Sequence, residues 1–336
     1  MLEITKNLIS LFLTLAGYVY FLFFKRTPQL IYQSYVKSYC FTNGRISHFL
    51  NFFNKYFITD NFSYNKNIIF KDLNFDEINN KLKKNGYYVF ENKIDEDTLK
   101  KIINFSYNTK CYYYNDKGTK KFTTFNPYLK PEEYQSAKYS FNETDLFNFN
   151  PIKKIIFNNK FITIAYKYFN SKPFLSDVAM WWSPTRNLKP TNETEQANQS
   201  AQKFHFDLDR IKWLKLFIYL SDTHEDSGPH EYVQGSHKIS AKPKSILKNG
   251  YTRIDESIIE NNFPKDKIIK ILGSKGTMFI ADTSCFHRGL PPISEHRLIL
   301  IIEYASSMFG AEFGKIKKLN EDKIDENLII KNKIID

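Results

Sequence analysis

The spacing of hydrophobic residues changes near residue 174, and with it the kind of element that the chain predicts. Before this point apolar residues recur mainly at helical intervals, with one short strand at 86–90. The predicted helices cover 29–57, with a break at Gly44, and then 74–84, 94–105 and 151–169. Asn74 and Asp95 are candidate N-caps, because side-chain oxygens of this type accept hydrogen bonds from the first turn of a helix.

After residue 174, short runs of β-branched and aromatic residues alternate with turn residues. The predicted strands cover 175–183, 203–208, 213–221, 230–234, 268–272, 276–281 and 297–305. Many short strands separated by turns are typical of a sandwich or barrel rather than of a parallel α/β sheet. We therefore predict a mainly β protein with flanking helices, in which the strands form a double-sheet jelly roll.

Two regions are expected along the chain, a helical segment at 1–60 and a jelly-roll domain at 61–336. The helices predicted after residue 60 have apolar faces that need the sheet to cover them, so we assign them to the same domain as the strands.

An uncharged stretch at residues 8–24 lies near the start of the chain, between Lys6 and Lys25. A transmembrane helix needs about 20 apolar residues, with a range of roughly 17–25, so this stretch is at the short limit. Two interpretations stay open, a membrane anchor and a helix buried against the main domain. An anchor would leave the rest of the chain in the cytoplasm, because Lys25, Arg26 and Lys37 follow the apolar stretch.

The composition is sufficient for a large hydrophobic core and limits the classes of binding partner that we expect. Of the 336 residues, 42% are hydrophobic and 17% aromatic. A net charge of +12 admits nucleic acid, an anionic membrane or acidic substrates. The lysines are dispersed, without a dense basic block that carries interleaved aromatic residues, so we do not expect nucleic-acid binding. Cys40, Cys111 and Cys285 have no metal-site spacing and form no disulfide framework, which favours a reducing, cytosolic compartment.

The strongest chemical signal combines a short motif with a distant histidine. His205 and Asp207 lie two residues apart in a predicted strand, so both side chains point to one face. His287 follows the predicted strand at 276–281 and could reach the same point. Two imidazoles and one carboxylate form the set that holds non-haem Fe(II) with open positions. Asp209 shares the face and is the rival carboxylate.

Arg297 begins the last predicted strand and adds an anion-binding group. A buried arginine on an apolar strand face is costly unless an anion meets it, and its planar guanidinium suits a carboxylate. The alternative is a structural salt bridge, for example with Glu303. The remaining histidines are weaker ligand candidates, because they lie in predicted turns, on the helical side, or facing away from Arg297. They are His48, His224, His230, His237 and His296.

The order of motifs resembles the phytanoyl-CoA dioxygenase-like family. The motifs are His205-x-Asp207, Tyr219-Leu220-Ser221-Asp222, Ser227-Gly228-Pro229, Gly235-Ser236-His237-Lys238, Gly276-Thr277, His287 and Arg297. The resemblance extends over about residues 75–305 and is strongest at 202–304. Nothing in it concerns residues 1–60.

The resemblance implies a double-stranded β-helix (jelly roll, cupin-like) with Fe(II), 2-oxoglutarate and O2. It implies His205, Asp207 and His287 as metal ligands, Arg297 as the group that binds the distal carboxylate of 2-oxoglutarate, and Tyr219 as a residue lining that cosubstrate. The implied reaction hydroxylates a small or lipid-like organic molecule and releases succinate and CO2. Gly289 departs from the family, because many relatives carry serine at this position.

Two alternatives remain open. One is a cupin-like metal enzyme that does not use 2-oxoglutarate, with Arg297 as a structural residue. The other is a jelly roll that binds a ligand without turnover. The substrate is not identified by the sequence. Trp181 and Trp182 could line an apolar pocket, although core packing is the simpler interpretation, and Lys138 is more simply explained as a solvated lysine than as a substrate contact.

Overall fold

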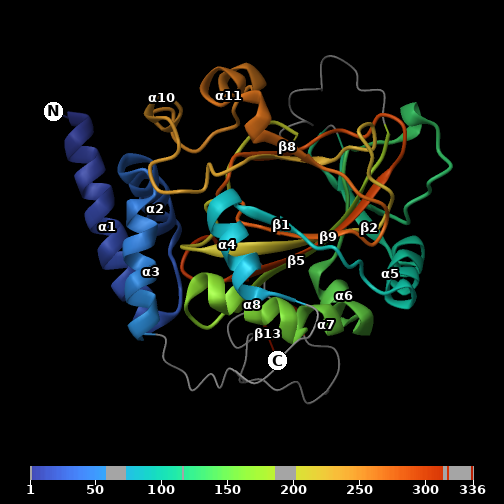
Figure 1. Ribbon diagram of the computed structural model, residues 1–336, viewed down its shortest axis with the longest axis horizontal. Helices are drawn as coiled ribbons and strands as arrows, with labels where there is room; N and C mark the ends of the chain where they lie inside the picture. Colours follow the sequence, from blue (N-terminus) through green and yellow to red (C-terminus); the bar gives the residue numbers. More distant parts are fainter. Residues whose placement is uncertain are drawn as a thin grey trace.

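Two antiparallel β-sheets form the centre of the molecule in the computed structural model, which describes residues 2–57, 73–115, 117–185, 202–312, 316–317 and 334–335 (Figure 1). The larger sheet has eight strands in the order β1 (Tyr87–Val89), β9 (Met278–Ala281), β6 (Trp213–Tyr219), β11 (Arg297–Ala305), β5 (Phe174–Ser183), β4 (Tyr139–Phe141), β2 (Cys111–Tyr114) and β3 (Lys120–Thr123). The smaller sheet has the order β10 (His287–Gly289), β7 (His230–Val233) and β8 (Ile268–Ile271). A short parallel pair, β12 (Ile316–Lys317) and β13 (Ile334–Ile335), lies apart from both sheets in the strand pairing.

The two faces of the large sheet carry different side chains. On β6, Leu214, Leu216 and Ile218 join the core beneath the helices, whereas Phe217 and Tyr219 pack with Tyr232 of the small sheet. Strand β11 is buried along its whole length. Its side chains point alternately to the helix-covered core and to the small sheet. This alternation with a period of two places Lys215 and Arg297 between the sheets.

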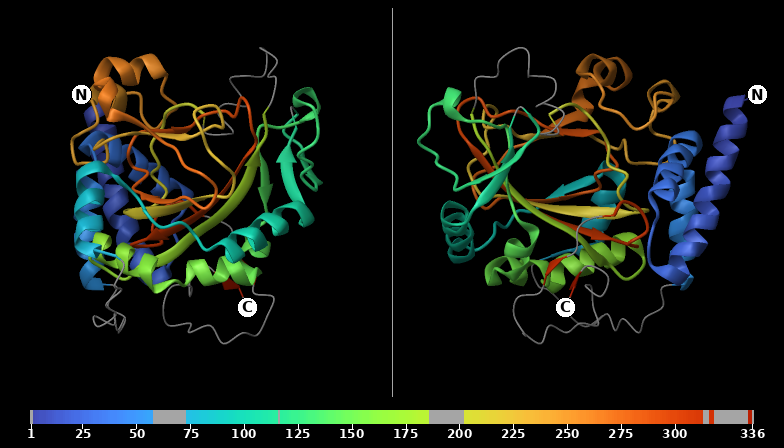
Figure 2. Two further views of the ribbon diagram at one scale, coloured as in Figure 1. Left: turned by 45° about the vertical axis from the view of Figure 1, so that its right-hand side comes forward. Right: turned by 180° about the vertical axis from the view of Figure 1, so that it is seen from behind.

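Five helices cover the outer face of the large sheet, as the two views of Figure 2 show. They are α4 (Phe75–Asn85), α5 (Glu96–Asn108), α6 (Glu143–Asn148), α7 (Asn150–Ile156) and α8 (Asn159–Phe169). The short helices α10 (Lys244–Leu247) and α11 (Glu256–Asn262) lie in the connection between β7 and β8. Two 3-10 turns occur at Pro131–Glu133 and Lys265–Lys267.

The N-terminal helices form a separate layer at one side of the barrel (Figure 1). They are α1 (Leu2–Phe24), α2 (Gln29–Thr42) and α3 (Arg45–Phe57). Buried residues of this layer share a hydrophobic cluster with barrel residues such as Phe206 and Phe309. The expected boundary near residue 60 falls in 58–72, outside the described residues.

The predicted fold class, mainly β with flanking helices in a double-stranded β-helix, is confirmed. The Asn74 side chain accepts a hydrogen bond from the Glu77 amide, and Asp95 accepts one from the Thr98 amide, so both predicted caps are also correct. The predicted break at Gly44 is present, with Asn43 in the left-handed conformation and Gly44 at φ +82°.

Two element predictions were wrong. Residues 151–169 do not form one helix, because the Asn158 side chain accepts a hydrogen bond from the Lys160 amide and begins α8 after a break. Residues 203–208 do not form a strand ladder, since only isolated bridges join Phe204 to Ile254 and His205 to His287.

Candidate metal centre

The side chains of His205, Asp207 and His287 lie together inside the barrel. One ligand atom from each residue falls within 4.8 Å of the others, and all three residues are buried. The Nε2 atom of His205 is 3.8 Å from Asp207 Oδ1, and that of His287 is 3.7 Å from Asp207 Oδ2. The structure therefore assembles the three residues that the sequence singled out.

Backbone pairing brings the two histidines together. The His205 amide donates to the His287 carbonyl at 3.0 Å, and the His287 amide donates to the His205 carbonyl at 2.8 Å. Residues paired in this way across antiparallel segments place their side chains next to each other on one face. The two imidazole centroids are accordingly 4.3 Å apart.

Backbone carbonyls fix the orientation of both imidazoles. His205 Nδ1 lies 2.9 Å from the Lys203 carbonyl, and His287 Nδ1 lies 2.9 Å from the Cys285 carbonyl. Because a carbonyl oxygen can only accept, each Nδ1 carries the proton and each Nε2 presents a lone pair. Burial lowers the pKa of both imidazoles, which keeps them neutral. The donor set fits a divalent transition metal such as Fe(II).

A buried lysine balances the carboxylates around the centre. Lys215 Nζ is 2.7 Å from Asp207 Oδ2, 3.2 Å from Glu303 and 3.8 Å from Asp209. Burial alone would raise the pKa of Asp207, but Lys215 and the imidazoles lower it well below its usual range. Burial and the neighbouring Asp207 raise the pKa of Asp209 to about 7. Asp209 is therefore a weaker ligand candidate than Asp207.

Arg297 is buried on the inner face of β11 and has no carboxylate partner within ion-pair distance among the described residues. Its Nη1 donates to the carbonyls of Gly228 and Leu290, and its Nη2 lies 3.2 Å from Ser183 Oγ. Its Nε has no acceptor. The suggested salt bridge with Glu303 is wrong, because Glu303 pairs with Lys215.

The glycine at position 289 lets the backbone of β10 lie close to the guanidinium. A Cβ atom there would lie 3.3 Å from Arg297 Nη2 and 3.7 Å from His230 Nε2. A buried arginine with an unused donor and no side chain at position 289 fits a carboxylate ligand such as the distal end of 2-oxoglutarate.

Tyr219 lies near Arg297, but its hydroxyl is already hydrogen-bonded to backbone groups. It donates to the Ile271 carbonyl at 2.9 Å and accepts from the His230 amide at 3.1 Å. These bonds connect β6 to both β7 and β8. The ring packs in the hydrophobic cluster between the two sheets, and the hydroxyl is engaged.

Sequence reasoning missed two interior residues and misjudged a third. His230 was grouped with the turn histidines although the predicted strand at 230–234 begins with it; it is buried on β7 and pairs with Gly289 of β10. Lys215 was not considered. A strict alternation along 230–234 and 213–221 would have placed both side chains on the inner face. Lys138 is half-buried rather than solvated, with Nζ 4.1 Å from the centroid of the Trp181 ring, and burial lowers its pKa to about 8.

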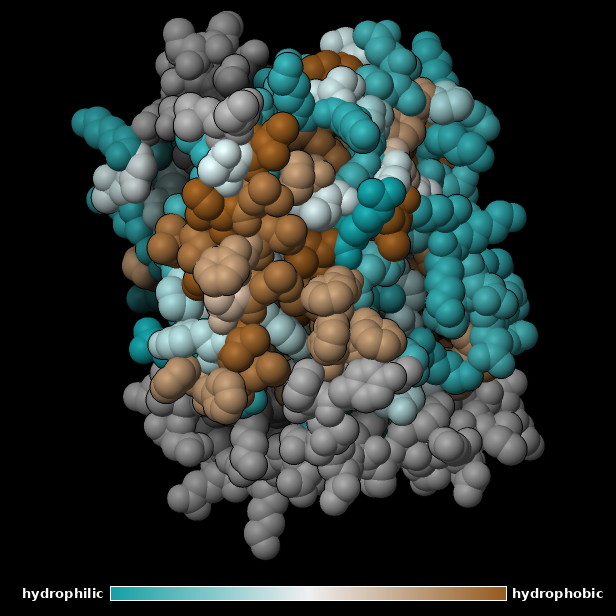
Figure 3. Space-filling view, turned by 90° about the vertical axis from the view of Figure 1, so that its left-hand side faces the viewer, coloured by the Kyte–Doolittle hydropathy of each residue, from teal (hydrophilic) through white to brown (hydrophobic). Residues whose placement is uncertain are grey.

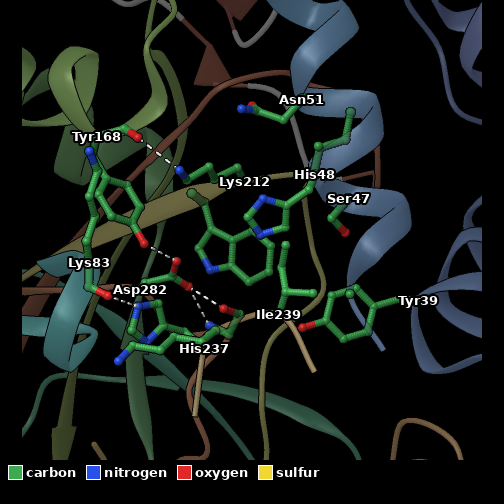
Figure 4. A pocket seen from close by; sticks show the side chains of 15 residues that line it. Tyr39, Ser47, His48, Asn51, Lys83, Tyr168, Lys212, His237, Ile239 and Asp282 are labelled. Atoms are coloured by element: carbon green, nitrogen blue, oxygen red, sulfur yellow. Dashed lines mark hydrogen bonds between the residues drawn. The ribbon is translucent and has the colours of Figure 1, made fainter. Parts of the chain in front are cut away.

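Two other histidines from the sequence lie at a separate cavity of about 390 Å³ between the N-terminal helices and the barrel (Figure 4). His237 contacts the Lys83 carbonyl at 3.2 Å, and His48 lines the same cavity. No member of the triad lines it. His296 instead contacts the Tyr134 hydroxyl and the Thr185 amide, so these histidines do not approach the metal centre.

The sequence matches the model of the phytanoyl-CoA dioxygenase (PhyH) family over residues 82–298, more than half of the chain. The chain belongs to this family. The match confirms the expected class of Fe(II)- and 2-oxoglutarate-dependent oxygenases, and with it the expected cofactors Fe(II), 2-oxoglutarate and O2. No curated protein matched the chain.

Solved structures with a similar fold have low sequence identity. HygX from Streptomyces hygroscopicus, with nickel and 2-oxoglutarate bound, is 14% identical and has a TM-score of 0.48, over 74% of this chain and 92% of HygX. The epimerase SnoN from nogalamycin biosynthesis is 13% identical with a TM-score of 0.47, over 69% of this chain and 82% of SnoN. EctD from S. alaskensis is 15% identical with a TM-score of 0.47, over 70% and 80% of the two chains.

The charge cluster predicts a large effect of replacing Lys215. The variant Lys215→Met leaves Asp207, Asp209 and Glu303 buried without their cation, which should cost about 3–5 kcal/mol in the metal-free protein. Added Mn(II) should restore part of this loss, because it binds the folded state and supplies positive charge. Urea unfolding with and without Mn(II) measures both effects.

Lys270→Met is the matched control, because Lys270 pairs with Glu225 at the surface, where an ion pair contributes about 0–1 kcal/mol. Equal losses in the two variants would show that Lys215 does not stabilise the carboxylates.

Proposed function

We propose that the protein is an Fe(II)- and 2-oxoglutarate-dependent dioxygenase that hydroxylates a small or lipid-like organic substrate, with succinate and CO2 as coproducts. One observation carries the proposal: a buried His-Asp-His triad shares the interior of the barrel with a buried arginine that has an unused donor. The triad accounts for the metal and the arginine accounts for the cosubstrate.

In this proposal His205, Asp207 and His287 hold the metal. The Lys203 and Cys285 carbonyls keep the imidazole lone pairs directed at one point, and Lys215 holds one oxygen of Asp207. Bound Fe(II), together with 2-oxoglutarate and O2, supplies the oxidant for a C–H bond of the substrate. The protein positions the reactants and shields them from water.

Arg297 receives the distal carboxylate of 2-oxoglutarate, and Gly289 adds no side chain that would compete for the guanidinium. Among the described residues the Nε donor has no acceptor and no carboxylate competes for the guanidinium, which supports this role. Ser183 steadies the guanidinium from β5. Tyr219 lines the cosubstrate with its ring, while its hydroxyl holds His230 and β8 in place.

The substrate end of the cavity is assigned to β4 and β5. Trp181 and Asp177 alternate with buried residues on β5 and are partly exposed. Lys138 lies over Trp181, and its pKa responds to both Asp177 and Arg297. Trp182 is excluded from this role, because it stacks on Phe125 in the outer core with centroids 4.6 Å apart.

We place the enzyme in a reducing compartment such as the cytoplasm. Cys40, Cys111 and Cys285 are all free thiols, and burial raises the pKa of each. Thiols with raised pKa values are poorly reactive, so we do not expect any of these three cysteines to form a disulfide readily.

The reaction is tested by incubating the purified protein with Fe(II), ascorbate, 2-oxoglutarate, O2 and fractionated metabolites. We expect substrate-dependent succinate and a product heavier by one oxygen atom. His287→Ala should abolish both, because the metal loses one of two imidazoles, whereas the exposed His224→Ala should retain them. Succinate with an isomeric product would replace hydroxylation by an isomerisation, with ascorbate supplying the two electrons that the substrate does not lose. No succinate in any fraction would favour the binding protein without turnover.

Cosubstrate binding is tested separately by replacing Arg297. Arg297→Met should weaken 2-oxoglutarate binding about 10- to 100-fold, because a hydrogen bond to a charged group contributes about 1.5–3 kcal/mol. Anaerobic titration of the visible charge-transfer band of the Fe(II)–2-oxoglutarate complex gives the dissociation constant. Metal affinity should not change. Arg26→Met, at an exposed arginine, is the control. An unchanged constant in Arg297→Met would favour the metal enzyme that does not use 2-oxoglutarate.

A further inference from the structure

The outer surface of the N-terminal helices is strongly apolar. Figure 3 shows hydrophobic side chains gathered over this side of the molecule. Phe12 and Phe23 of α1 are 70% and 77% exposed, and exposed phenylalanines follow on α2 and α3. The surface, here called the apolar face, includes Leu8, Phe12, Phe23, Phe41, Phe49 and Phe52. Water-soluble monomers rarely expose a continuous apolar surface of this kind without a partner.

The buried side of α1 carries small or hydroxyl-bearing residues in its first half and the aromatic residues Tyr18 and Phe21 toward its end. Ser10, Thr14 and Gly17 are buried, and Thr14 Oγ1 is 2.9 Å from Ser38 Oγ of α2. At Gly17 a Cβ atom would lie 2.1 Å from the Ile31 side chain, so the glycine permits close approach of α1 and α2. A helix at a protein–water boundary instead carries mainly polar side chains on its outer side. Small residues and hydroxyl contacts between helices, with large apolar side chains outside, are typical of helices packed in lipid.

The net positive charge of these helices indicates what kind of partner would bind the apolar face. Residues 2–57 contain six basic side chains, Lys6, Lys25, Arg26, Lys37, Arg45 and Lys55, and a single acidic one, Glu3. An anionic lipid surface attracts each such basic residue by about 1 kcal/mol. A second copy of the chain would instead bring like charges together. The charge therefore favours lipid over self-association.

The packing of α1 decides between crossing a bilayer and lying on it. By length and composition Glu3–Phe24 could span a membrane. However, Tyr18 and Phe21 are buried against Phe309 of the barrel, with ring centroids 5.5 and 5.7 Å apart, and Thr14 contacts Ser38. A spanning helix would have to leave these contacts.

We propose that α1, α2 and α3 dock the protein onto an anionic lipid surface through the apolar face, with α1 lying in the interface and not crossing the bilayer. The outer phenylalanines enter the lipid and the basic side chains meet the headgroups. This resolves the two interpretations of residues 8–24 in favour of a third arrangement, a helix packed on the barrel by one side and on lipid by the other. The proposal does not depend on catalysis.

Co-sedimentation of the full chain with vesicles tests the docking. We expect binding to vesicles of phosphatidylcholine with phosphatidylserine, weaker binding to phosphatidylcholine alone, and loss of the difference at high salt. Phe12→Ser/Phe23→Ser should lower the bound-to-free ratio about tenfold or more, because burial of one phenylalanine contributes about 1.5–3 kcal/mol. Phe122→Ser/Tyr128→Ser removes two aromatics of 64% and 92% exposure, one on the edge strand β3 and one after it, outside the N-terminal helices, and should bind normally.

Three results would overturn the proposal. The first is equal binding of the two double variants. The second is absence of vesicle binding together with a dimer, seen by analytical ultracentrifugation, that Phe12→Ser/Phe23→Ser dissociates. The third is retention of the protein by vesicles after an alkaline carbonate wash, which would indicate a spanning helix. Unchanged thermal unfolding and unchanged Fe(II) binding in both double variants confirm that they are folded.

Discussion

A pair of backbone hydrogen bonds between residues 205 and 287 is the constraint on which the centre depends. The segment that carries His205 belongs to neither sheet and is joined to its surroundings through isolated bridges. The bridge to His287, at the first residue of β10, sets the two imidazoles side by side. Asp207 follows two residues later, and its amide donates to the Thr283 carbonyl. Two short backbone connections thus determine the position of all three side chains.

The charged side chains in the interior form two groups, one around the triad and one around Arg297, and the two groups differ in net charge. Around the triad, the three carboxylates of Asp207, Asp209 and Glu303 face two buried cations, Lys215 and Arg210, so negative charge is in excess before a metal binds. Around Arg297 no carboxylate is present among the described residues, and His230 is held neutral by burial beside the arginine. A metal ion at the triad and a carboxylate at Arg297 would neutralise both groups. This complementarity is the physical basis for expecting a cation and a dicarboxylate in one cavity.

The sequence predicted the features that follow from local rules. Alternation with a period of two, together with turn residues, predicted most of the strands after residue 174. The capping residues Asn74 and Asp95 predicted where two helices begin. The convergence of His205 with His287 needed the family resemblance, because the bridge between them is a long-range contact. His230 and Lys215 were missed because a turn assignment and a single charged residue in an apolar run concealed their inner-face positions. The close packing of α1 on α2 could not be predicted either, because it depends on Gly17 and Ile31 meeting in three dimensions.

The most direct measurement of the central claim is anomalous X-ray diffraction at the iron edge from crystals grown anaerobically with Fe(II) and 2-oxoglutarate. The account predicts one strong peak within coordination distance of Nε2 of His205, Nε2 of His287 and a carboxylate oxygen of Asp207, with 2-oxoglutarate extending from it to Arg297. A peak elsewhere, or crystals that take up iron without a peak between these three side chains, would contradict it.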